Sequence, residues 1–449
     1  MLLRTFARSR SSDSTGHRDR SIDAIRALSL VLVVLGHTVM GIVYWGEERL
    51  VLGNLLAIDS RLHWLTWVFQ IMPVFFIAGG AANYLSLKGK EITYSTWLWK
   101  RISRLLSPTL TYLVIMLSIG FIFTRFLSES FMQIYLLMVT QLLWFLGVYI
   151  ICTAMFPLIL RLPRVVSIVA LSGAVVAVDV ARFTWVETIG ILNFLFVWLL
   201  IMFIGTLFVN PLSLRLNITF AVIVFIIELS LVLNDIYPVS LVGLPTETFS
   251  NVAPPSILIA LHGILFLFVL SILKPAIIRI CENPRVWGSV VSVNVGAMTV
   301  YLWHIPMIMA IAITLEFLGL SPATTLNGNV VLPGSGFWNQ IIVYWALAIL
   351  AVYLFVQVIW PLEHLKIPFW DTVPSEQKVW WRTALAGISV TLSGFGLLGI
   401  AGSGLFGFPN RVVSFAGFSY TNGLALLLFI CGLFILKLSV SGYSVKSPR

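Results

Sequence analysis

The sequence predicts an all-α integral membrane protein, a polytopic bundle of about twelve transmembrane helices. Hydrophobic residues make up 59% of its 449 residues and charged residues only 10%, so a soluble domain would lack the polar surface to cover its core. Apolar runs of about 20 residues recur along the chain, which is the length that a helix needs to cross a bilayer and about twice that of a barrel strand. The Lys and Arg residues gather between these runs, as they do in membrane proteins.

The apolar runs predict helices over residues 24–44, 64–87, 105–123, 139–160, 165–183, 188–209, 217–235, 255–273, 291–315, 338–360, 383–402 and 419–437. Residues 131–138 are also apolar but would overfill the fourth run, so we expect a short interfacial or re-entrant piece there. When alternate connections are assigned to opposite sides of the membrane, most of the 28 Lys and Arg residues fall on the side of the two termini. Because positive charge marks the cytoplasmic side, we expect both termini in the cytoplasm.

The net charge of +10 does not indicate a nucleic-acid partner, because the basic residues lie between apolar segments as topology signals. No spacing of His, Cys and carboxylate residues is typical of a metal site, and the three cysteines show no pairing pattern. We therefore expect neither a metal centre nor a disulfide framework.

The first apolar run carries the most informative polar residues, Asp23, Arg26 and His37. At about 100° per residue they share one stripe of a helix, and a rise of about 1.5 Å per residue puts His37 roughly 16 Å beyond Arg26. Asp23 and Arg26 are also spaced to pair directly. An ionisable group so deep in a bilayer is costly and indicates a function, for which an imidazole offers proton transfer. The alternative is a histidine that bonds to a neighbouring helix and holds the bundle together.

Two further groups carry chemistry. Arg101 and Arg104 share one face at the start of the third helix, where they either anchor the helix at the cytoplasmic surface or bind phosphates through bidentate contacts. His304 lies about thirteen residues into the ninth helix, about as deep as His37 lies in the first, so the two imidazoles are placed to line one cavity. Here too the alternative is a buried structural histidine.

Six short motifs follow one another in the order Arg20-x-x-Asp23-x-x-Arg26-(x10)-His37, Met72-Pro-Val-Phe75-Phe76-Ile-Ala-Gly79-Gly80, Arg101-x-x-Arg104-Leu-Leu-x-Pro108, Trp144-Phe-Leu, Ser250-Asn251-Val-Ala-Pro-Pro255 and Tyr301-Leu-Trp-His304. In this combination the chain resembles the acyltransferase type 3 family of membrane acyltransferases, and the last two motifs resemble an actinobacterial-type subgroup. The resemblance covers about residues 18–360. The chain departs from the family at Ala78, where many members have Ser, and it has no SGNH-type hydrolase domain.

The resemblance implies a ten-helix acyltransferase core over residues 21–362. A cytoplasmic loop and an additional pair of helices follow over residues 363–449. The Arg- and Ser-rich residues 1–20 offer little apolar surface to bury, so we expect a disordered cytoplasmic N-terminus there.

The resemblance further implies an enzyme that transfers an acyl group from a cytoplasmic donor, usually an acyl-CoA, to a hydroxyl of a glycan, glycolipid or other acceptor. His37 matches the catalytic histidine and Arg26 its essential partner, with Asp23 beside them. Arg101 and Arg104 match the basic motif proposed to hold the donor's phosphates. Residues of the other motifs are candidates for the substrate cavity, namely Trp144, Asn251, Tyr301 and His304.

Acyl-CoA is then a co-substrate, no permanently bound cofactor is expected, and the protein lies among the lipids of a bacterial plasma membrane. The residues leave open whether His37 deprotonates the acceptor directly or takes part in a covalent acyl-enzyme. They also leave open the acyl group, the acceptor, the side of the membrane on which the acceptor is modified and the oligomeric state. The alternative function is a transporter or flippase that binds a polar or anionic substrate at mid-membrane.

Overall fold

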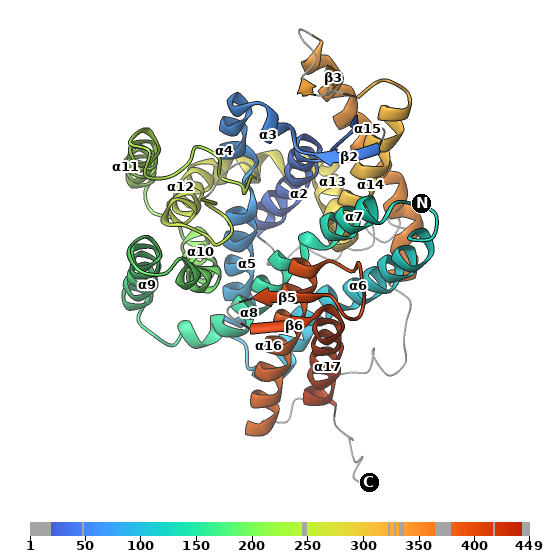
Figure 1. Cartoon of the computed structure of the whole chain (residues 1–449). Helices are drawn as coiled ribbons and strands as arrows, with labels where there is room; N and C mark the ends of the chain where they lie inside the picture. The colour runs from blue at the N-terminus through green and yellow to red at the C-terminus, as the bar shows by residue number, and fades with distance from the viewer. Residues whose placement is uncertain are drawn as a thin grey trace. The chain divides into compact units, whose positions relative to one another are not determined.

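The computed structural model describes residues 19–46, 49–244, 249–321, 324–326, 329–331, 336–363, 379–415 and 418–441 (Figure 1). Within these residues, twelve helical spans are long and apolar enough to cross a membrane. The predicted polytopic helical fold is therefore confirmed. Residues 1–18 of the expected disordered N-terminus and most of the expected loop after residue 363 lie outside the described residues, whereas Asp19 and Arg20 are ordered as the N-cap and first residue of a helix.

The helices are α2 (Arg20–Met40), α3 (Leu55–Ile58), α4 (Thr66–Phe69), α5 (Met72–Leu87), α6 (Tyr94–Phe123), α7 (Glu129–Gln141), α8 (Leu143–Ile159), α9 (Arg164–Thr184), α10 (Asn193–Val209), α11 (Leu214–Leu233), α12 (Ile257–Ile280), α13 (Pro284–Val295), α14 (Ala297–Phe317), α15 (Phe337–Glu363), α16 (Trp380–Ser403) and α17 (Asn422–Val440). Two 3₁₀ helices, Ser60–Leu65 and Glu187–Leu192, lead into α4 and α10.

Three antiparallel hairpins, which the sequence did not predict, connect some of these helices. They are β1 (Ile42–Gly46) with β2 (Arg49–Gly53), β3 (Thr324–Leu326) with β4 (Asn329–Val331), and β5 (Val412–Phe415) with β6 (Phe418–Thr421). The strands have three to five residues each, too short to give a strong alternating pattern.

Some predicted boundaries shift for identifiable reasons. Helix α6 begins at Tyr94 rather than near residue 105, because a helix accommodates the charged Lys100, Arg101 and Arg104 that lower its hydropathy. The predicted ninth helix divides at Gly296 into α13 and α14. Residues 131–138 lie within α7, and Leu142 alone separates α7 from α8.

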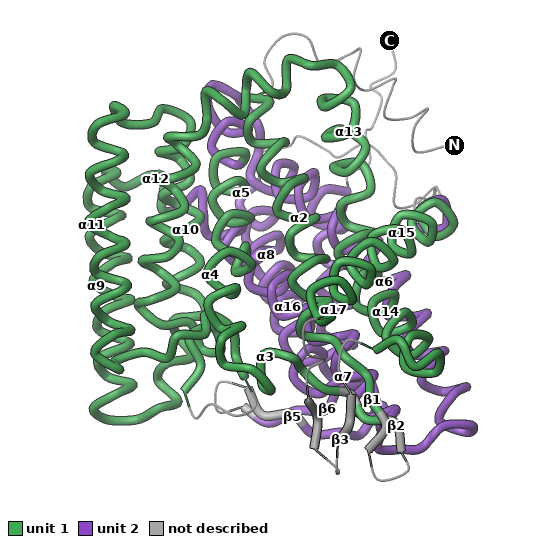
Figure 2. The backbone as a smooth tube through the Cα atoms, turned by 90° about the horizontal axis from the view of Figure 1, so that it is seen from above, with its two compact units in different colours: residues 1–82, 159–360 green, residues 83–158, 361–449 purple. Residues whose placement is uncertain are grey.

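The described chain divides into two compact units, which Figure 2 shows in different colours. Unit 1 contains residues 1–82 and 159–360, and unit 2 contains residues 83–158 and 361–449. In unit 1, α9, α10, α11 and α12 are neighbours (Figure 2), and α2 packs against α4, α12, α13 and α14. In unit 2, α16 and α17 form a closely packed pair that also contacts α6.

Close helix crossings in both units depend on glycine. In unit 1, a Cβ on Gly80 of α5 would collide with the backbone oxygen of Met202 on α10, and one on Gly205 would collide with the backbone oxygen of Ile77. In unit 2, a Cβ on Gly396 of α16 would lie 2.6 Å from the backbone nitrogen of Phe429 on α17. Small residues at such crossings let helix backbones approach each other, which is how helices associate where lipid removes the hydrophobic driving force.

We expect Gly80→Ala to lower the thermal unfolding temperature in detergent micelles, because the new methyl group meets a backbone atom that no side-chain rotation can move. Overpacking of this kind typically costs about 1–3 kcal/mol. Gly173→Ala on the exposed face of α9 is the matched control, since nothing lies within 4 Å of the position that its methyl group would take. Equal unfolding temperatures for the two variants would contradict the close crossing of α5 and α10.

Candidate active site

The start of α2 is fixed by a hydrogen-bonded carboxylate. Asp19 caps the helix by accepting a hydrogen bond from the Ser21 backbone N–H at 3.0 Å. Its Oδ2 also lies 3.0 Å from Nζ of Lys274 on α12. The same ammonium donates to the carbonyl oxygens of Phe208 and Val209, at 2.9 and 3.2 Å, at the end of α10. One lysine therefore joins the beginning of α2, the end of α10 and α12.

The first turns of α2 hold Asp23 and Arg26. Asp23 is 6% exposed, and its backbone carbonyl accepts a hydrogen bond of 2.8 Å from the Asn294 side chain of α13. Arg26 is half-buried and forms no hydrogen bond or ion pair with any described residue. The direct Asp23–Arg26 pair that the spacing allowed is therefore not formed. An arginine without a protein partner in the first span of a membrane protein is available to an anionic ligand.

Farther along α2, His37 meets His304 of α14. Nδ1 of His37 lies 3.3 Å from Nε2 of His304, and the ring centroids are 5.1 Å apart at an interplanar angle of 55°. His304 is fully buried, whereas His37 is partly exposed. The matched depths in the sequence predicted that these two imidazoles are neighbours, and the structure brings them into contact.

Backbone carbonyl groups determine the tautomers of both rings. Nδ1 of His37 lies 2.9 Å from the carbonyl oxygen of Val33, and Nδ1 of His304 lies 3.0 Å from that of Val300. A carbonyl oxygen only accepts, so each Nδ1 carries a hydrogen and each neutral ring has its lone pair on Nε2. Nε2 of His37 has no hydrogen-bond partner among the described residues. It is therefore a basic nitrogen on a partly exposed ring.

The end of α2 near the histidines is also held in place. The Tyr344 hydroxyl of α15 donates to the carbonyl oxygen of Gly41 at 2.8 Å. A Cβ on Gly41 would come within 2.8 Å of the Met309 side chain of α14, so this turn lies directly against α14. Tyr301, one turn before His304, has its ring centroid 6.4 Å from that of His304. Tyr301 thus lies beside the histidine pair, as expected for a cavity residue, and its role stays a prediction.

Asn251, a predicted cavity residue, instead holds a connection together. It is fully buried, and its amide nitrogen donates to the carbonyl oxygens of Pro238 and Ser240, at 2.9 and 2.8 Å. Its amide oxygen accepts from the Ser256 hydroxyl at 2.9 Å. Since both ends of the amide are engaged within this connection, we assign Asn251 a structural role.

The same connection between α11 and α12 is tied to α9. Asp179 accepts a hydrogen bond from the Tyr237 hydroxyl at 2.6 Å and from the Ile257 N–H at 2.9 Å. Burial, together with the neighbouring Asp179 carboxylate, raises the pKa of the Tyr237 phenol well above its ordinary value. Arg182 donates to the carbonyl oxygen of Pro254 at 3.1 Å and lies 3.9 Å from the ring centroid of Phe249. The residues of the Ser250–Pro255 motif therefore stabilise the conformation of the connection between α11 and α12.

Arg101, Arg104 and Trp144 belong to unit 2. Arg101 is half-buried and Arg104 exposed, three residues apart on α6, and Arg104 forms no hydrogen bond or ion pair with a described residue. Trp144 lies at the start of α8 with its ring edge-on to Phe145. The remaining predicted site residues, Asp23, Arg26, His37, Asn251, Tyr301 and His304, belong to unit 1.

Sequence reasoning missed the residues that position α2. Asp19, directly before the helix, is a recognisable N-cap signal, whereas Lys274 and Asn294 come from distant segments and give no local pattern. It also gave no sign that Glu228 of α11 and His262 of α12 are neighbours. The structure places His262 Nδ1 3.5 Å from Glu228 Oε1, while His262 Nε2 lies 3.0 Å from the Trp67 carbonyl oxygen.

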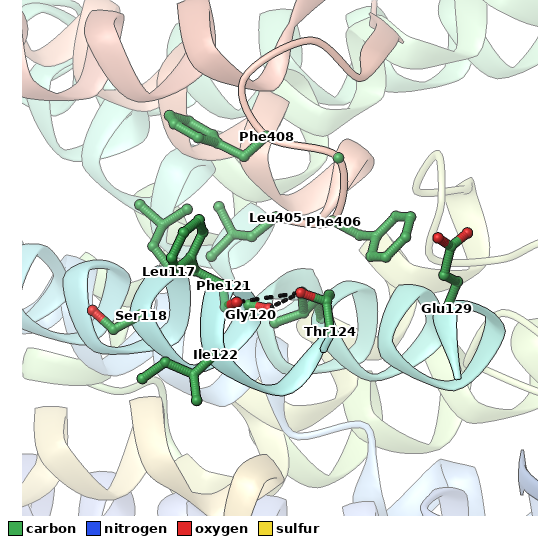
Figure 3. A pocket seen from close by; sticks show the side chains of 12 residues that line it. Leu117, Ser118, Gly120, Phe121, Ile122, Thr124, Glu129, Leu405, Phe406 and Phe408 are labelled. Carbon is green, nitrogen blue, oxygen red and sulfur yellow. Dashed lines mark hydrogen bonds between the residues drawn. The ribbon is translucent and has the colours of Figure 1, made fainter. Parts of the chain in front are cut away.

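A cavity of about 690 Å³ in unit 2 has none of the predicted site residues in its lining (Figure 3). It is lined by the end of α6, the start of α7 and the turn after α16, with mostly apolar side chains and the carboxylate of Glu129 (Figure 3). No group of three His, Cys, Asp or Glu residues suited to a metal ion occurs in the described part of the chain.

A family model for an acyltransferase domain (Acyl_transf_3) matches residues 19–361. The chain belongs to the acyltransferase type 3 family. The matched region of the family begins at the N-cap of α2 and ends within α15, so it includes both histidines, and α16 and α17 follow it. Searches among curated proteins and among solved structures found no match. With its twelve apolar spans, this member of the family is an integral, multi-pass membrane acyltransferase, and the match favours the enzyme over the transporter or flippase.

The Asp19–Lys274 ion pair predicts a pH-dependent stability. Burial alone raises the pKa of Asp19, but the hydrogen bonds from Ser21 and the Lys274 ammonium outweigh it and hold the pKa below its ordinary value. A carboxyl whose pKa is lowered on folding stabilises the protein above its unfolded pKa of about 4 and loses this contribution as the pH falls through the folded value.

We therefore expect Lys274→Met to have a lower unfolding temperature than the native protein at pH 7. The difference between the two unfolding temperatures should decrease as the pH falls from about 5 to about 3. The measurement is thermal unfolding in micelles across this range. The exposed Lys90→Met is the control and should track the native protein at each pH. A gap that stays constant with pH would show that the ion pair does not stabilise the fold.

Proposed function

We propose that this membrane acyltransferase transfers an acyl group from the thioester of an acyl-CoA to a hydroxyl of a glycan, a glycolipid or another acceptor, with His37 as the catalytic base. The observation that carries the proposal is Nε2 of His37, a lone-pair nitrogen without a partner among the described residues, on a ring whose Nδ1–H is held by Val33. A general base needs this combination of a fixed ring and a free nitrogen.

In the proposed reaction, the acyl group passes directly from the thioester to the acceptor hydroxyl. Nε2 of His37 takes the proton of the acceptor hydroxyl while the hydroxyl oxygen attacks the carbonyl carbon of the thioester. A C–O bond forms, the C–S bond breaks, and the thiolate of the coenzyme leaves. The imidazolium then returns its proton to the thiolate sulfur, so that the products are an ester and a free thiol, and His37 is neutral again.

We assign Arg26 to the binding of an anionic group of the donor. Arg26 lies on the same stripe of α2 as His37, with its Cα roughly 16 Å away at about 1.5 Å per residue, and its side chain pairs with no described residue. Burying part of a cation without a counter-ion costs free energy, which an anionic substrate group would offset. The carboxylate of Asp23, one turn before Arg26, lies on the same stripe.

Arg101 and Arg104 we assign to the phosphates of the coenzyme, on the resemblance of the Arg101-x-x-Arg104 motif and on their spacing along one face of α6. The donor then approaches from the cytoplasm, since the distribution of Lys and Arg favours a cytoplasmic start of α6. We place the enzyme in a bacterial plasma membrane because its last two motifs resemble an actinobacterial-type subgroup.

We expect His37→Ala to lower the rate of acyl transfer by a factor of about 10²–10⁴, because general base catalysis contributes a factor of this size. The assay incubates purified protein in micelles with labelled acetyl-CoA and an envelope glycan fraction and measures label in the glycan. His63→Ala is the matched histidine control, since His63 Nε2 bonds to the carbonyl oxygen of Leu56, a local contact between residues seven apart. Native activity in His37→Ala would contradict the assignment of His37 as the catalytic base.

The covalent alternative has its own readout. Mass spectrometry of the native protein incubated with donor alone would show an acyl mass on the His37 peptide if an acyl-enzyme accumulates. Direct base catalysis predicts that this peptide stays unmodified while the complete reaction proceeds.

Arg101→Gln combined with Arg104→Gln should raise KM for acetyl-CoA at least tenfold, because the phosphates lose bidentate partners. The same variant should keep its KM for acetyl-pantetheine, which lacks the nucleotide phosphates. Lys100→Gln, an exposed neighbour on α6, serves as the control for the loss of a nearby positive charge. An equal rise for both donors would contradict the assignment to phosphates.

A further inference from the structure

We propose that His304 is a positioning residue for His37: its neutral Nε2 accepts the Nδ1–H of His37 and stabilises the imidazolium that forms when Nε2 of His37 takes a proton. The inference rests on the proposed role of His37 and deepens it. It assigns His304 no contact with the substrate.

The distances and tautomers support this direction of donation. Because Nδ1 of His304 donates to the Val300 carbonyl, its Nε2 bears a lone pair, and this lone pair faces Nδ1 of His37 at 3.3 Å. The Nδ1–H of His37 is therefore shared between two acceptors, the Val33 carbonyl oxygen at 2.9 Å and His304 Nε2. The arrangement holds the ring and leaves its second nitrogen to the acceptor hydroxyl.

A neutral imidazole is well suited to this task. A carboxylate in its place would attract a proton to His37 before the reaction and would remove the base. A neutral acceptor interacts modestly with the neutral ring and more strongly once the ring is charged, since hydrogen bonds to ions are the stronger ones. The stabilisation therefore increases as charge develops in the transition state, which is the condition for accelerating a reaction.

The burial of His304 strengthens the effect and limits the pair to one extra proton. His304 is 0% exposed, so little water competes for its lone pair. If His304 itself were protonated at Nε2, its N–H would point at the N–H of His37. The pair thus favours the state in which an incoming proton lies on His37, at the nitrogen that faces away from His304.

Several titratable groups lie on the elements packed against α2. On α12, Lys274 pairs with Asp19, and Nε2 of His262 lies at hydrogen-bond distance from the Trp67 carbonyl oxygen. On α15, Tyr344 bonds to Gly41. On α14, the Tyr301 ring centroid is 6.4 Å from that of His304.

The other charged groups on these elements lie near helix ends: Arg20, Asp23 and Arg26 in the first two turns of α2, Arg279 in the last turn of α12, Glu316 near the end of α14 and Glu363 at the end of α15. On α13, Arg285 is exposed in the first turn. Among the described residues, the side chain that hydrogen-bonds to the His37 ring and lies in ring contact with it is His304.

The test compares His304→Gln with His304→Asn in the acyl-transfer assay. A Gln carbonyl oxygen reaches about where Nε2 of the native ring lies, whereas the shorter Asn does not reach across to His37. We expect His304→Asn to lower kcat roughly ten- to a hundredfold, as the loss of a hydrogen bond to a charged group predicts, with an unchanged KM for acetyl-CoA. His304→Gln should recover most of this loss.

The pH profile separates positioning from packing. Removing the acceptor destabilises protonated His37, so the acid limb of kcat/KM should move to lower pH in His304→Asn and stay near the native position in His304→Gln. Both variants are first compared by thermal unfolding in micelles. Where His304→Asn does not fold, His304→Leu replaces it as the variant without an acceptor.

Three outcomes overturn the inference. Native kcat in His304→Asn removes any role for the residue, and an equal loss in both variants with an unmoved acid limb indicates packing alone. A loss in His304→Gln as large as that in His37→Ala indicates that His304 is itself the base. Failure of the proposed function has a different signature, because His37→Ala would then keep native activity whatever the His304 variants do.

Discussion

Inside a bundle of membrane-spanning helices, a polar group has little water to bond to and must find a partner in the protein. This constraint explains how the structure uses its buried hydrogen-bonding side chains. Asn251 satisfies both ends of its amide within one connection, and Lys274 bonds to a carboxylate and two carbonyl oxygens. In the proposed function, a substrate provides the partner for Nε2 of His37 and for the guanidinium of Arg26, which have none among the described residues.

The position of the first helix follows from its two ends. Lys274 fixes its start to α10 and α12, and Tyr344 fixes the residue after its end to α15. Between these points His37 meets His304 on α14. A base that must reach a reacting hydroxyl within a fraction of an ångström benefits from such support, since small displacements of catalytic groups cost large factors in rate. In the proposed function, these hydrogen bonds at the two ends of α2 therefore help to hold His37 in position for the reaction.

Hydropathy predicted the twelve spans because each apolar run had to be long enough to cross the bilayer. The similar depth of His37 and His304 in two helices that run in the same direction predicted that both imidazoles line one cavity, and in the structure they are in contact. The family resemblance made Asn251 a candidate for the cavity, and a motif does not reveal the hydrogen bonds that this amide forms within its own connection. The charged Lys100, Arg101 and Arg104 concealed the first turns of α6. Contacts such as Lys274 with Asp19 join residues far apart in the chain, and no local pattern encodes them. The family match supplied what the residues alone left undecided, the class of reaction.

The family match ends at residue 361, yet α17 packs against α6, the helix that carries Arg101 and Arg104. Lys437 of α17, 1% exposed, lies 4.8 Å from the ring centroid of Trp99, two residues before Arg101. The terminal helix pair thus packs against the helix that carries Arg101 and Arg104 and supports its position. A protein truncated after residue 361 would lose the contacts of α16 and α17 with α6. A shortened version of the enzyme should therefore keep these two helices, although they lie beyond the family match.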